Sequence, residues 1–160
     1  MGGVKVGEVW TIGIDPGKTG AVGLLRDGGY VAAADWTSGP EVAGTLRLWL
    51  DLYPVGLVAL EEVHSMPKQG VVSSFSFGAS WGWWVGLLDA LEAPWRLVRP
   101  QQWQPGFIGK KASPTDKPGL LVARRLWPEA PLKLAKHHNR ADALLIGRWA
   151  WMQALGGGRA

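Results

Sequence analysis

The sequence predicts one α/β domain whose sheet has three antiparallel strands followed by parallel strands, with helices on both faces. Two patterns support this fold class: three short apolar runs separated by turn residues come first, and helical runs then alternate with apolar runs of strand length. The length of 160 residues is enough for one hydrophobic core and suggests no second domain. We expect the domain to span residues 1–155, followed by a glycine-rich tail over 156–160.

The strands and helices are predicted from local periodicity and turn chemistry. Asp27-Gly28-Gly29 suits a tight hairpin between the second and third strands, and the uninterrupted apolar run at 56–60 is typical of a buried central strand. The Pro-, Gly-, Gln- and Lys-rich stretch at 99–118 is expected to be a loop. The predicted strands are 9–14, 21–25, 30–34, 56–60 and 95–98, and the predicted helices are 41–52, 71–91, 119–127 and 138–155.

The amino-acid composition excludes some catalytic chemistries and suggests a class of binding partner. Because the chain has no cysteine, disulfides, thiolate catalysis and cysteine-ligated zinc are excluded. Residues 1–62 hold eight acids and four bases (net −4), whereas residues 63–160 hold five acids and thirteen bases (net +8). This asymmetry suggests a polyanionic partner, nucleic acid first, although an ordinary solvated surface would give the same counts.

No membrane or secretory segment is expected. Residues 70–88 carry no charge over 19 positions, but they include four serines and four glycines, so a buried or interface helix is favoured over a membrane span. The N-terminus leads directly into a predicted strand without a secretory signal. We therefore expect a cytoplasmic protein, in the host cytoplasm if a phage encodes it.

Acidic residues follow two of the predicted strands. Asp15 ends the first apolar run, where Asp-Pro-Gly also suits a plain turn. Glu61 and Glu62 follow the buried run at 57–60 and must point to opposite faces, so one can share a face with Asp15 while the other pairs with an ion or faces solvent. Two carboxylates at adjacent strand ends suit Mg²⁺ or Mn²⁺.

A third acid lies on the last predicted helix. His138 and Asp142 are four residues apart and therefore share a helix face, which continues into a stripe expected to be core: Leu145, Ile146, Trp149 and Met152. The alternative is an aspartate that merely complements the helix N-terminus, with Asn139 as the cap. Three clustered carboxylates would repel one another unless divalent cations lie between them, and two such cations can promote phosphodiester hydrolysis.

The acidic motifs, in their order along the chain, resemble those of RuvC-like Holliday-junction resolvases of the phage-type branch, within the RNase H-like superfamily. The resemblance covers roughly residues 11–151 and includes segments like 64–86 and 98–103 between the acidic motifs. The motifs that carry it are Ile12-Gly13-Ile14-Asp15-Pro16-Gly17, Leu60-Glu61-Glu62-Val63 and His138-Asn139-Arg140-Ala141-Asp142-Ala143-Leu144-Leu145.

The resemblance implies an RNase H-like fold and a metal-dependent endonuclease that resolves four-way DNA junctions as a homodimer, without a small-molecule cofactor. It implies Asp15, Glu61 and Asp142 as catalytic metal ligands for Mg²⁺ or Mn²⁺, with two ions per site. Many relatives carry another acid one turn before the last. This sequence offers only His138, which we expect to be the fourth ligand or a proton acceptor, and Asn139 in reserve.

Basic and aromatic residues are the candidates for DNA contacts. Phe75 and Phe77 would stack on bases or open the junction, although burial in the core is the alternative for Phe77. The cations expected to contact phosphates are Lys18, Lys68, Lys110, Lys111, Lys117 and Arg140. In the predicted helix at 71–91, a ridge of Gly78, Gly82 and Gly86 would let a second subunit approach, unless the ridge packs on its own sheet.

Three alternative functions can be compared with the sequence. An RNase H-type or transposase-like nuclease would keep the acids and lose the preference for junctions. A junction-binding protein without activity would have no use for acids beside phosphates. A sugar-kinase relative matches the segment at 15–20 but needs a duplicated domain, for which 160 residues are too few.

Overall fold

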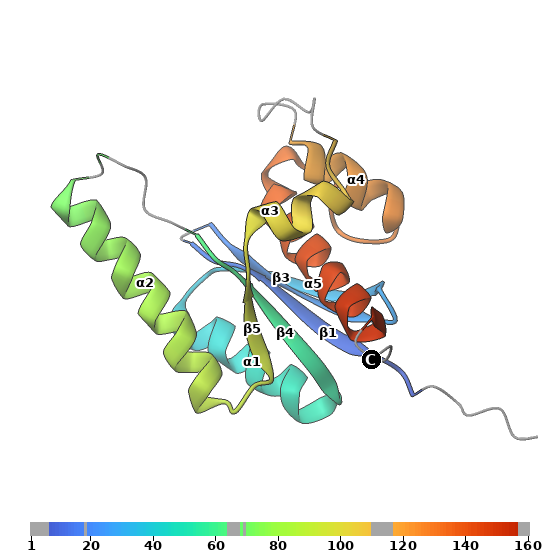
Figure 1. Cartoon of the computed structure of the whole chain (residues 1–160), viewed down its shortest axis with the longest axis horizontal. Helices are drawn as coiled ribbons and strands as arrows, with labels where there is room; N and C mark the ends of the chain where they lie inside the picture. Colours follow the sequence, from blue (N-terminus) through green and yellow to red (C-terminus); the bar gives the residue numbers. More distant parts are fainter. Residues whose placement is uncertain (1–6, 18, 64–67, 69, 110–116, 157–160) are drawn as a thin grey trace, which may run out of the picture.

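Five strands form one mixed sheet in the computed structural model, which describes residues 7–17, 19–63, 68, 70–109 and 117–156. Their order across the sheet is β3-β2-β1-β4-β5. The first three pair antiparallel, and β4 and β5 continue parallel to β1 (Figure 1), which confirms the predicted fold class. The strands are β1 (Trp10–Asp15), β2 (Ala21–Arg26), β3 (Gly29–Asp35), β4 (Val55–Glu61) and β5 (Trp95–Val98).

The β2–β3 hairpin turns as its sequence predicts. Asp27 and Gly28 have φ angles of 50° and 74°, the left-handed pair that a two-residue hairpin requires. The Gly28 carbonyl accepts hydrogen bonds from the Trp127 indole and the Arg148 guanidinium, at 3.1 and 2.9 Å. The hairpin is therefore tied to the helices that cover this side of the sheet.

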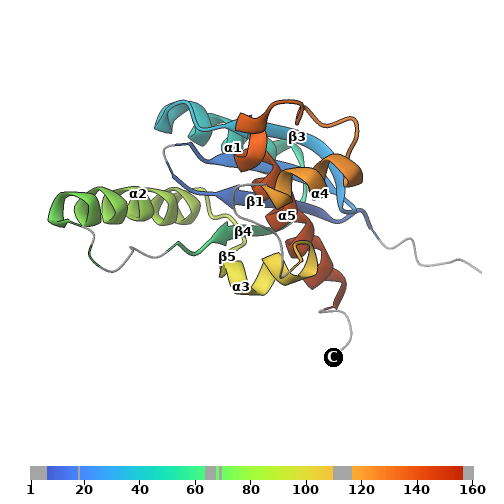
Figure 2. The same cartoon turned by 90° about the horizontal axis from the view of Figure 1, so that it is seen from above.

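Helices cover both faces of the sheet and form two apolar cores (Figure 2). Helices α1 (Gly39–Leu52) and α2 (Val71–Ala90) pack on the face that carries Ile12, Ile14 and Leu60. The other face is covered by α3 (Pro100–Trp103), α4 (Pro118–Leu126) and α5 (His138–Gly156). Since strand side chains alternate, Thr11, Gly13 and Asp15 lie on the α5 face of β1.

Helix α2 extends well beyond the sheet. Its first turns project past the ends of the strands in both views (Figures 1 and 2), and within it only Trp84 and Leu88 are buried. Val71, Val72 and Phe75 are 87%, 80% and 77% exposed. No helix in the described part of the chain is long and apolar enough to cross a membrane.

The stretch at 99–118 differs from the expected loop. It contains α3 and the short 3₁₀ helix η1 (Gln104–Gly106), and α4 begins at Pro118. Trp103, at the end of α3, is 1% exposed and anchors this segment in the core, a contact that the Pro- and Gly-rich sequence around it does not indicate. The other predicted elements agree with the structure to within one or two residues at each end.

Candidate active site

Helix α5 lies directly against β1 because two glycines meet there. A Cβ atom added to Gly13 would lie 1.9 Å from the Ala143 carbonyl oxygen and 2.3 Å from the Gly147 nitrogen, so only glycine fits. The Thr11 hydroxyl donates a 2.9 Å hydrogen bond to the Gly147 carbonyl. These contacts fix the height of α5 above the sheet and place its N-terminal half over the ends of the central strands.

Three carboxylates are brought to this edge from three elements. Asp15 ends β1 and Glu61 ends β4, and the parallel register that pairs Ile14 with Leu60 puts the two acids on neighbouring strand ends. Asp142 comes from the second turn of α5, five residues before the contact at Gly147. Leu145, Ile146 and Trp149 on the same stripe are buried as predicted, but Met152 is 45% exposed because α5 continues past its last core residue, Ala150.

Burial raises the pKa values of all three acids, and neighbouring carboxylates add to the effect at Asp15 and Asp142. Burial raises the pKa of Asp15 well above its usual range, and the charges of Glu61 and Asp142 raise it further. Burial, followed by the Glu61 charge, raises the pKa of Asp142 to about 7. Burial also raises the pKa of Glu61, against the opposing effect of a hydrogen bond from Trp103. The site therefore carries more negative charge than its surroundings stabilise.

The adjacent glutamates have different environments. Glu61 is 8% exposed and faces the α3 side, where its Oε1 accepts a 2.9 Å hydrogen bond from the Trp103 indole. Glu62 lies at the rim, with its Oε2 3.4 Å from the Arg99 Nε. This division matches the expectation that one glutamate joins Asp15 while the other forms an ion pair.

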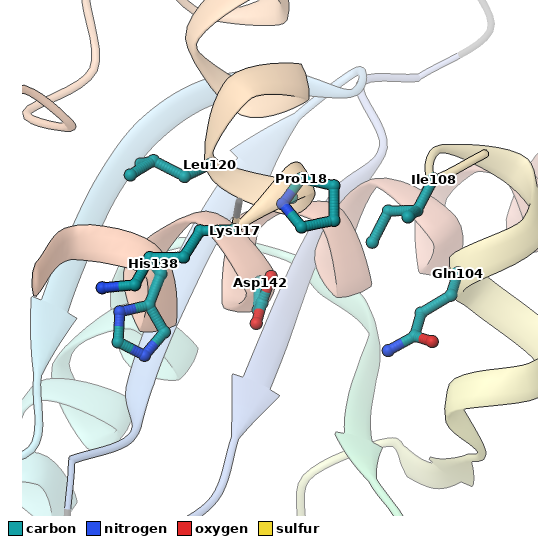
Figure 3. A pocket seen from close by; sticks show the side chains of 8 residues that line it. Gln104, Ile108, Lys117, Pro118, Leu120, His138 and Asp142 are labelled. Atoms are coloured by element: carbon teal, nitrogen blue, oxygen red, sulfur yellow. The ribbon is translucent and has the colours of Figure 1, made fainter. Parts of the chain in front are cut away.

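A pocket of about 350 Å³ opens beside Asp142 (Figure 3). His138, one helical turn earlier on α5, lines it together with Lys117 and Gln104. His138 Nδ1 lies 3.2 Å from the Ala135 carbonyl oxygen, so a proton on Nδ1 would leave Nε2 free to bind a metal or accept a proton. The position predicted for the fourth ligand thus lies in the same pocket as Asp142.

Gly119, at the start of α4, closes one wall of this pocket. A Cβ atom at this position would lie 2.4 Å from Asp142 Oδ1, so a larger residue would have to displace the carboxylate. Lys117, just before α4, donates a 3.1 Å hydrogen bond from Nζ to the Ala135 carbonyl and lines the pocket. This cation is therefore placed where a phosphate could approach the acids.

Asn139 and Arg140 connect α5 to the β1–β2 connection and to the end of β3, respectively. The Asn139 amide donates a hydrogen bond to the Thr19 carbonyl. Arg140, expected to contact DNA, has a different set of partners: its Nε and Nη2 donate to both oxygens of Asp35 at 2.6 and 2.7 Å, and its Nη1 donates to the Pro131 carbonyl at 2.9 Å. These bonds anchor the first turn of α5 and occupy donors that a phosphate contact would need.

Lys68, Phe75 and Phe77 do not line the pocket beside Asp142. Lys68 and Phe75 are exposed around the start of α2. Phe77 is partly buried, belongs to neither apolar core, and lines a second pocket between α2 and Gly17. Lys18, Lys110 and Lys111 lie outside the described residues.

The donor chemistry of the site suits a divalent cation, but the side chains do not converge on one point. Among the described residues, no three His, Asp or Glu side chains are close enough together to ligate one ion. However, the raised pKa values of Asp15, Glu61 and Asp142 indicate uncompensated negative charge, which a cation would neutralise. The residues therefore fit a hard cation in charge and ligand type.

Sequence reasoning missed three residues of the site: Trp103, Gln104 and Gly119. Trp103 lies within a segment that the family resemblance included, but nothing in its local pattern indicates a bond to a glutamate 42 positions earlier. Gln104 and Gly119 lie in or next to the stretch expected to be a loop, where glutamine and glycine are ordinary. The one indication in the sequence was Trp103 itself, a large apolar residue within a polar stretch.

Comparisons with known proteins agree with this geometry. No protein-family model matches the chain. Over 126 residues it is 33% identical to a chloroplastic Holliday junction resolvase, MOC1, from Chlamydomonas reinhardtii. The match covers 76% of this chain and 14% of that relative, so the chain spans about a seventh of the relative's length.

Solved structures resemble the chain over nearly its whole length. Thermus thermophilus RuvC in complex with a Holliday junction substrate has a TM-score of 0.68 at 18% identity, covering 92% of this chain and 96% of that one. A second Thermus thermophilus RuvC structure has a TM-score of 0.64 at 19% identity, with 92% and 97% covered. A fowlpox virus resolvase bound to Holliday junction DNA has a TM-score of 0.51 at 12% identity, with 92% and 99% covered.

The expected resemblance to RuvC-like resolvases is thereby confirmed, while assignment to the phage-type branch stays a prediction. The chain has the RuvC-like variant of the RNase H fold, and over most of its length its sequence is similar to part of a Holliday junction resolvase.

Proposed function

We propose that the chain is a divalent-metal-dependent endonuclease that resolves four-way DNA junctions. The observation that carries this proposal is the group of acids Asp15, Glu61 and Asp142, which three separate elements bring to one edge of a RuvC-like sheet. The similarity to a Holliday junction resolvase and the basic C-terminal part of the sequence support a branched DNA substrate.

In this proposal the three acids and His138 bind Mg²⁺ or Mn²⁺, two ions per site. When bound, the ions would lower the pKa of water and stabilise charge on the leaving oxygen. The chain's own groups orient the reaction: Lys117 contacts a phosphate at the pocket, and His138, in the alternative role to metal binding, accepts a proton from the attacking water at Nε2.

Lys68, Phe75 and Phe77 are proposed to contact the junction centre from the start of α2. We also propose that Lys18, Lys110 and Lys111 contact phosphates, on the basis of their sequence context alone. Arg140 is proposed to contribute less to DNA binding than these lysines, because Asp35 and Pro131 already accept its hydrogen bonds. A cytoplasmic location, in the host cell if a phage encodes the protein, completes the proposal.

Two active sites are needed to cut opposing strands, and we propose that a homodimer supplies them through α2. Added Cβ atoms at Gly78, Gly82 and Gly86 would meet nothing within 4 Å, which argues against the alternative that the ridge packs on its own sheet. Gly82 and Gly86 line an apolar groove between α1 and α2, together with Trp83 and Leu87. This groove would accept apolar side chains of a second α2 helix.

The test is cleavage of a labelled synthetic four-way junction in Mg²⁺, Mn²⁺ and EDTA, with linear duplex and RNA–DNA hybrid as controls. Paired, metal-dependent nicks in opposing arms of the junction alone are the expected result. Cleavage of the hybrid alone would move the protein to the RNase H class, and tight junction binding without cleavage would indicate a binding protein.

A further inference from the structure

The indole of Trp103 lies behind the active site and contacts Glu61 directly. Trp103 is 1% exposed, and its Nε1–H donates a 2.9 Å hydrogen bond to Oε1 of Glu61, itself 8% exposed. Among the side-chain hydrogen bonds of the described residues, this is the one that reaches a site carboxylate. A buried bond to a charged group contributes more than an ordinary one and strongly restricts the carboxylate's orientation.

The direction of this bond determines which oxygen of Glu61 is available. An indole nitrogen is only a donor, so Trp103 can occupy Oε1 but cannot compete for a cation. No side-chain hydrogen bond of the described residues reaches Oε2, so all the lone pairs of this oxygen are available to a metal ion. Without the bond, the Glu61 side chain could adopt several rotamers and present either oxygen to the ion. Metal binding would then have to restrict the side chain to one rotamer, at a cost in conformational entropy.

The segment that carries Trp103 is itself anchored to the end of β4. The backbone N–H of Glu62 donates to the Val98 carbonyl at 2.7 Å, and the Glu62 carboxylate lies 3.4 Å from Arg99 Nε. The backbone N–H of Arg99 donates to the Gln102 side chain at 2.9 Å, which closes the first turn of α3. Trp103 also packs in the core with α4 and α5, so its indole has a fixed position relative to the sheet.

We propose that Trp103 is a positioning residue for metal binding: its indole N–H holds the Glu61 carboxylate so that the second oxygen is available to the cation. This inference rests on the proposed metal-dependent function. It assigns to the stretch at 99–106 a part in building the site, in addition to lining the pocket through Gln104.

Trp127 provides a matched control for the loss of a buried indole. It is 3% exposed, belongs to the same core cluster, and donates one hydrogen bond from Nε1, to the Gly28 carbonyl at 3.1 Å. Trp103→Phe and Trp127→Phe each remove one buried hydrogen bond and keep an aromatic ring. The two variants differ in whether the lost partner is an active-site carboxylate.

The experiment measures the melting temperature of wild type, Trp103→Phe and Trp127→Phe as a function of Mn²⁺ concentration, and junction binding in EDTA. Both variants should melt earlier than wild type without metal and bind the junction as wild type does. Trp103→Phe should need about tenfold more Mn²⁺ for half-maximal stabilisation. Trp127→Phe should need the same concentration as wild type. Single-turnover cleavage by Trp103→Phe should recover most of its rate at saturating Mn²⁺.

An equal Mn²⁺ requirement in all three proteins would overturn the role of Trp103 and leave the proposed nuclease intact. Absence of any Mn²⁺ response in wild type would instead overturn the metal-dependent function itself. If Trp103→Phe does not fold, ¹H–¹⁵N spectra supply the test. In the metal-free protein, Glu61→Gln should shift one indole cross-peak relative to wild type. Addition of Mg²⁺ to wild type should shift the same cross-peak. No shared cross-peak would refute the proposal.

Discussion

Neutralising Asp142 should make the metal-free protein more stable above neutral pH, even though it removes a proposed active-site residue. Burial and the charge of Glu61 raise the pKa of Asp142 from 3.8 to about 7. Well below pH 3.8 this acid is protonated in both the folded and unfolded states. As the pH rises from about 4 to 7, the unfolded state loses the proton while the folded state retains it, so folding becomes less favourable.

The size of the effect follows from the pKa change. A shift of about three units corresponds to about 4 kcal/mol, because each unit is about 1.4 kcal/mol of differential stabilisation. We expect Asp142→Asn to raise the free energy of unfolding at pH 8 by about 2–4 kcal/mol, since the amide cannot ionise. For a chain of this length the melting temperature should rise by at least about 4 °C.

The assay is thermal denaturation in EDTA at pH 4.5 and pH 8, repeated at pH 8 with Mg²⁺. The variant should exceed wild type at pH 8 and differ far less at pH 4.5, and Mg²⁺ should stabilise wild type more than the variant. Asp51→Asn, at an exposed position of α1, is the control and should change little at either pH. If Asp142→Asn were no more stable than wild type at pH 8 without metal, the reasoning that burial and the Glu61 charge destabilise the ionised Asp142 would be refuted.

Four further substitutions test other parts of the site and the dimer. Asp15→Asn should reduce junction cleavage by about 10³-fold or more while leaving junction binding intact, and retained turnover would remove Asp15 from the mechanism. His138→Ala should slow cleavage or change the preference between Mg²⁺ and Mn²⁺, and unchanged kinetics in both metals would contradict its proposed role. Gly119→Ala should reduce cleavage by about 10²-fold because the new methyl group meets Asp142 Oδ1, and a crystal structure with the carboxylate in place would disprove this cause. Gly82→Leu should yield monomers in analytical ultracentrifugation if α2 pairs the subunits, whereas a stable dimer would place the interface elsewhere.

Sequence patterns predicted the parts of the fold that depend on short-range periodicity. The hairpin at Asp27-Gly28, the buried run of β4 and the apolar run in α5 each show their structure within a few residues. The acids Asp15 and Glu61 were predictable for the same reason, because each directly follows an apolar strand.

Contacts between distant segments were not predictable from one sequence. The bond from Trp103 to Glu61 spans 42 positions, and the bond from Arg140 to Asp35 spans 105. Local chemistry suggests DNA contact for an arginine beside an active-site aspartate, but only the folded chain shows that a carboxylate on β3 already pairs with it. Glycines have the same limitation, since Gly13 and Gly147 are needed for a close approach that exists only after folding.

Bringing Asp15, Glu61 and Asp142 together is electrostatically unfavourable, and the contacts that hold α5 against β1 offset this free energy. Asp142 can approach Asp15 and Glu61 only because α5 lies against β1 at Gly13 and Gly147, and the Thr11 hydroxyl bonds to the helix at the same level. These contacts carry no charge, so they retain their strength when the acids ionise. Burial and, after it, repulsion between the acids therefore raise the pKa values of Asp15 and Asp142, because the rigid helix does not let the side chains separate. A cation would bind to carboxylates that the fold has already brought together. Metal binding should therefore increase the stability of the folded protein most at alkaline pH, where the acids are ionised.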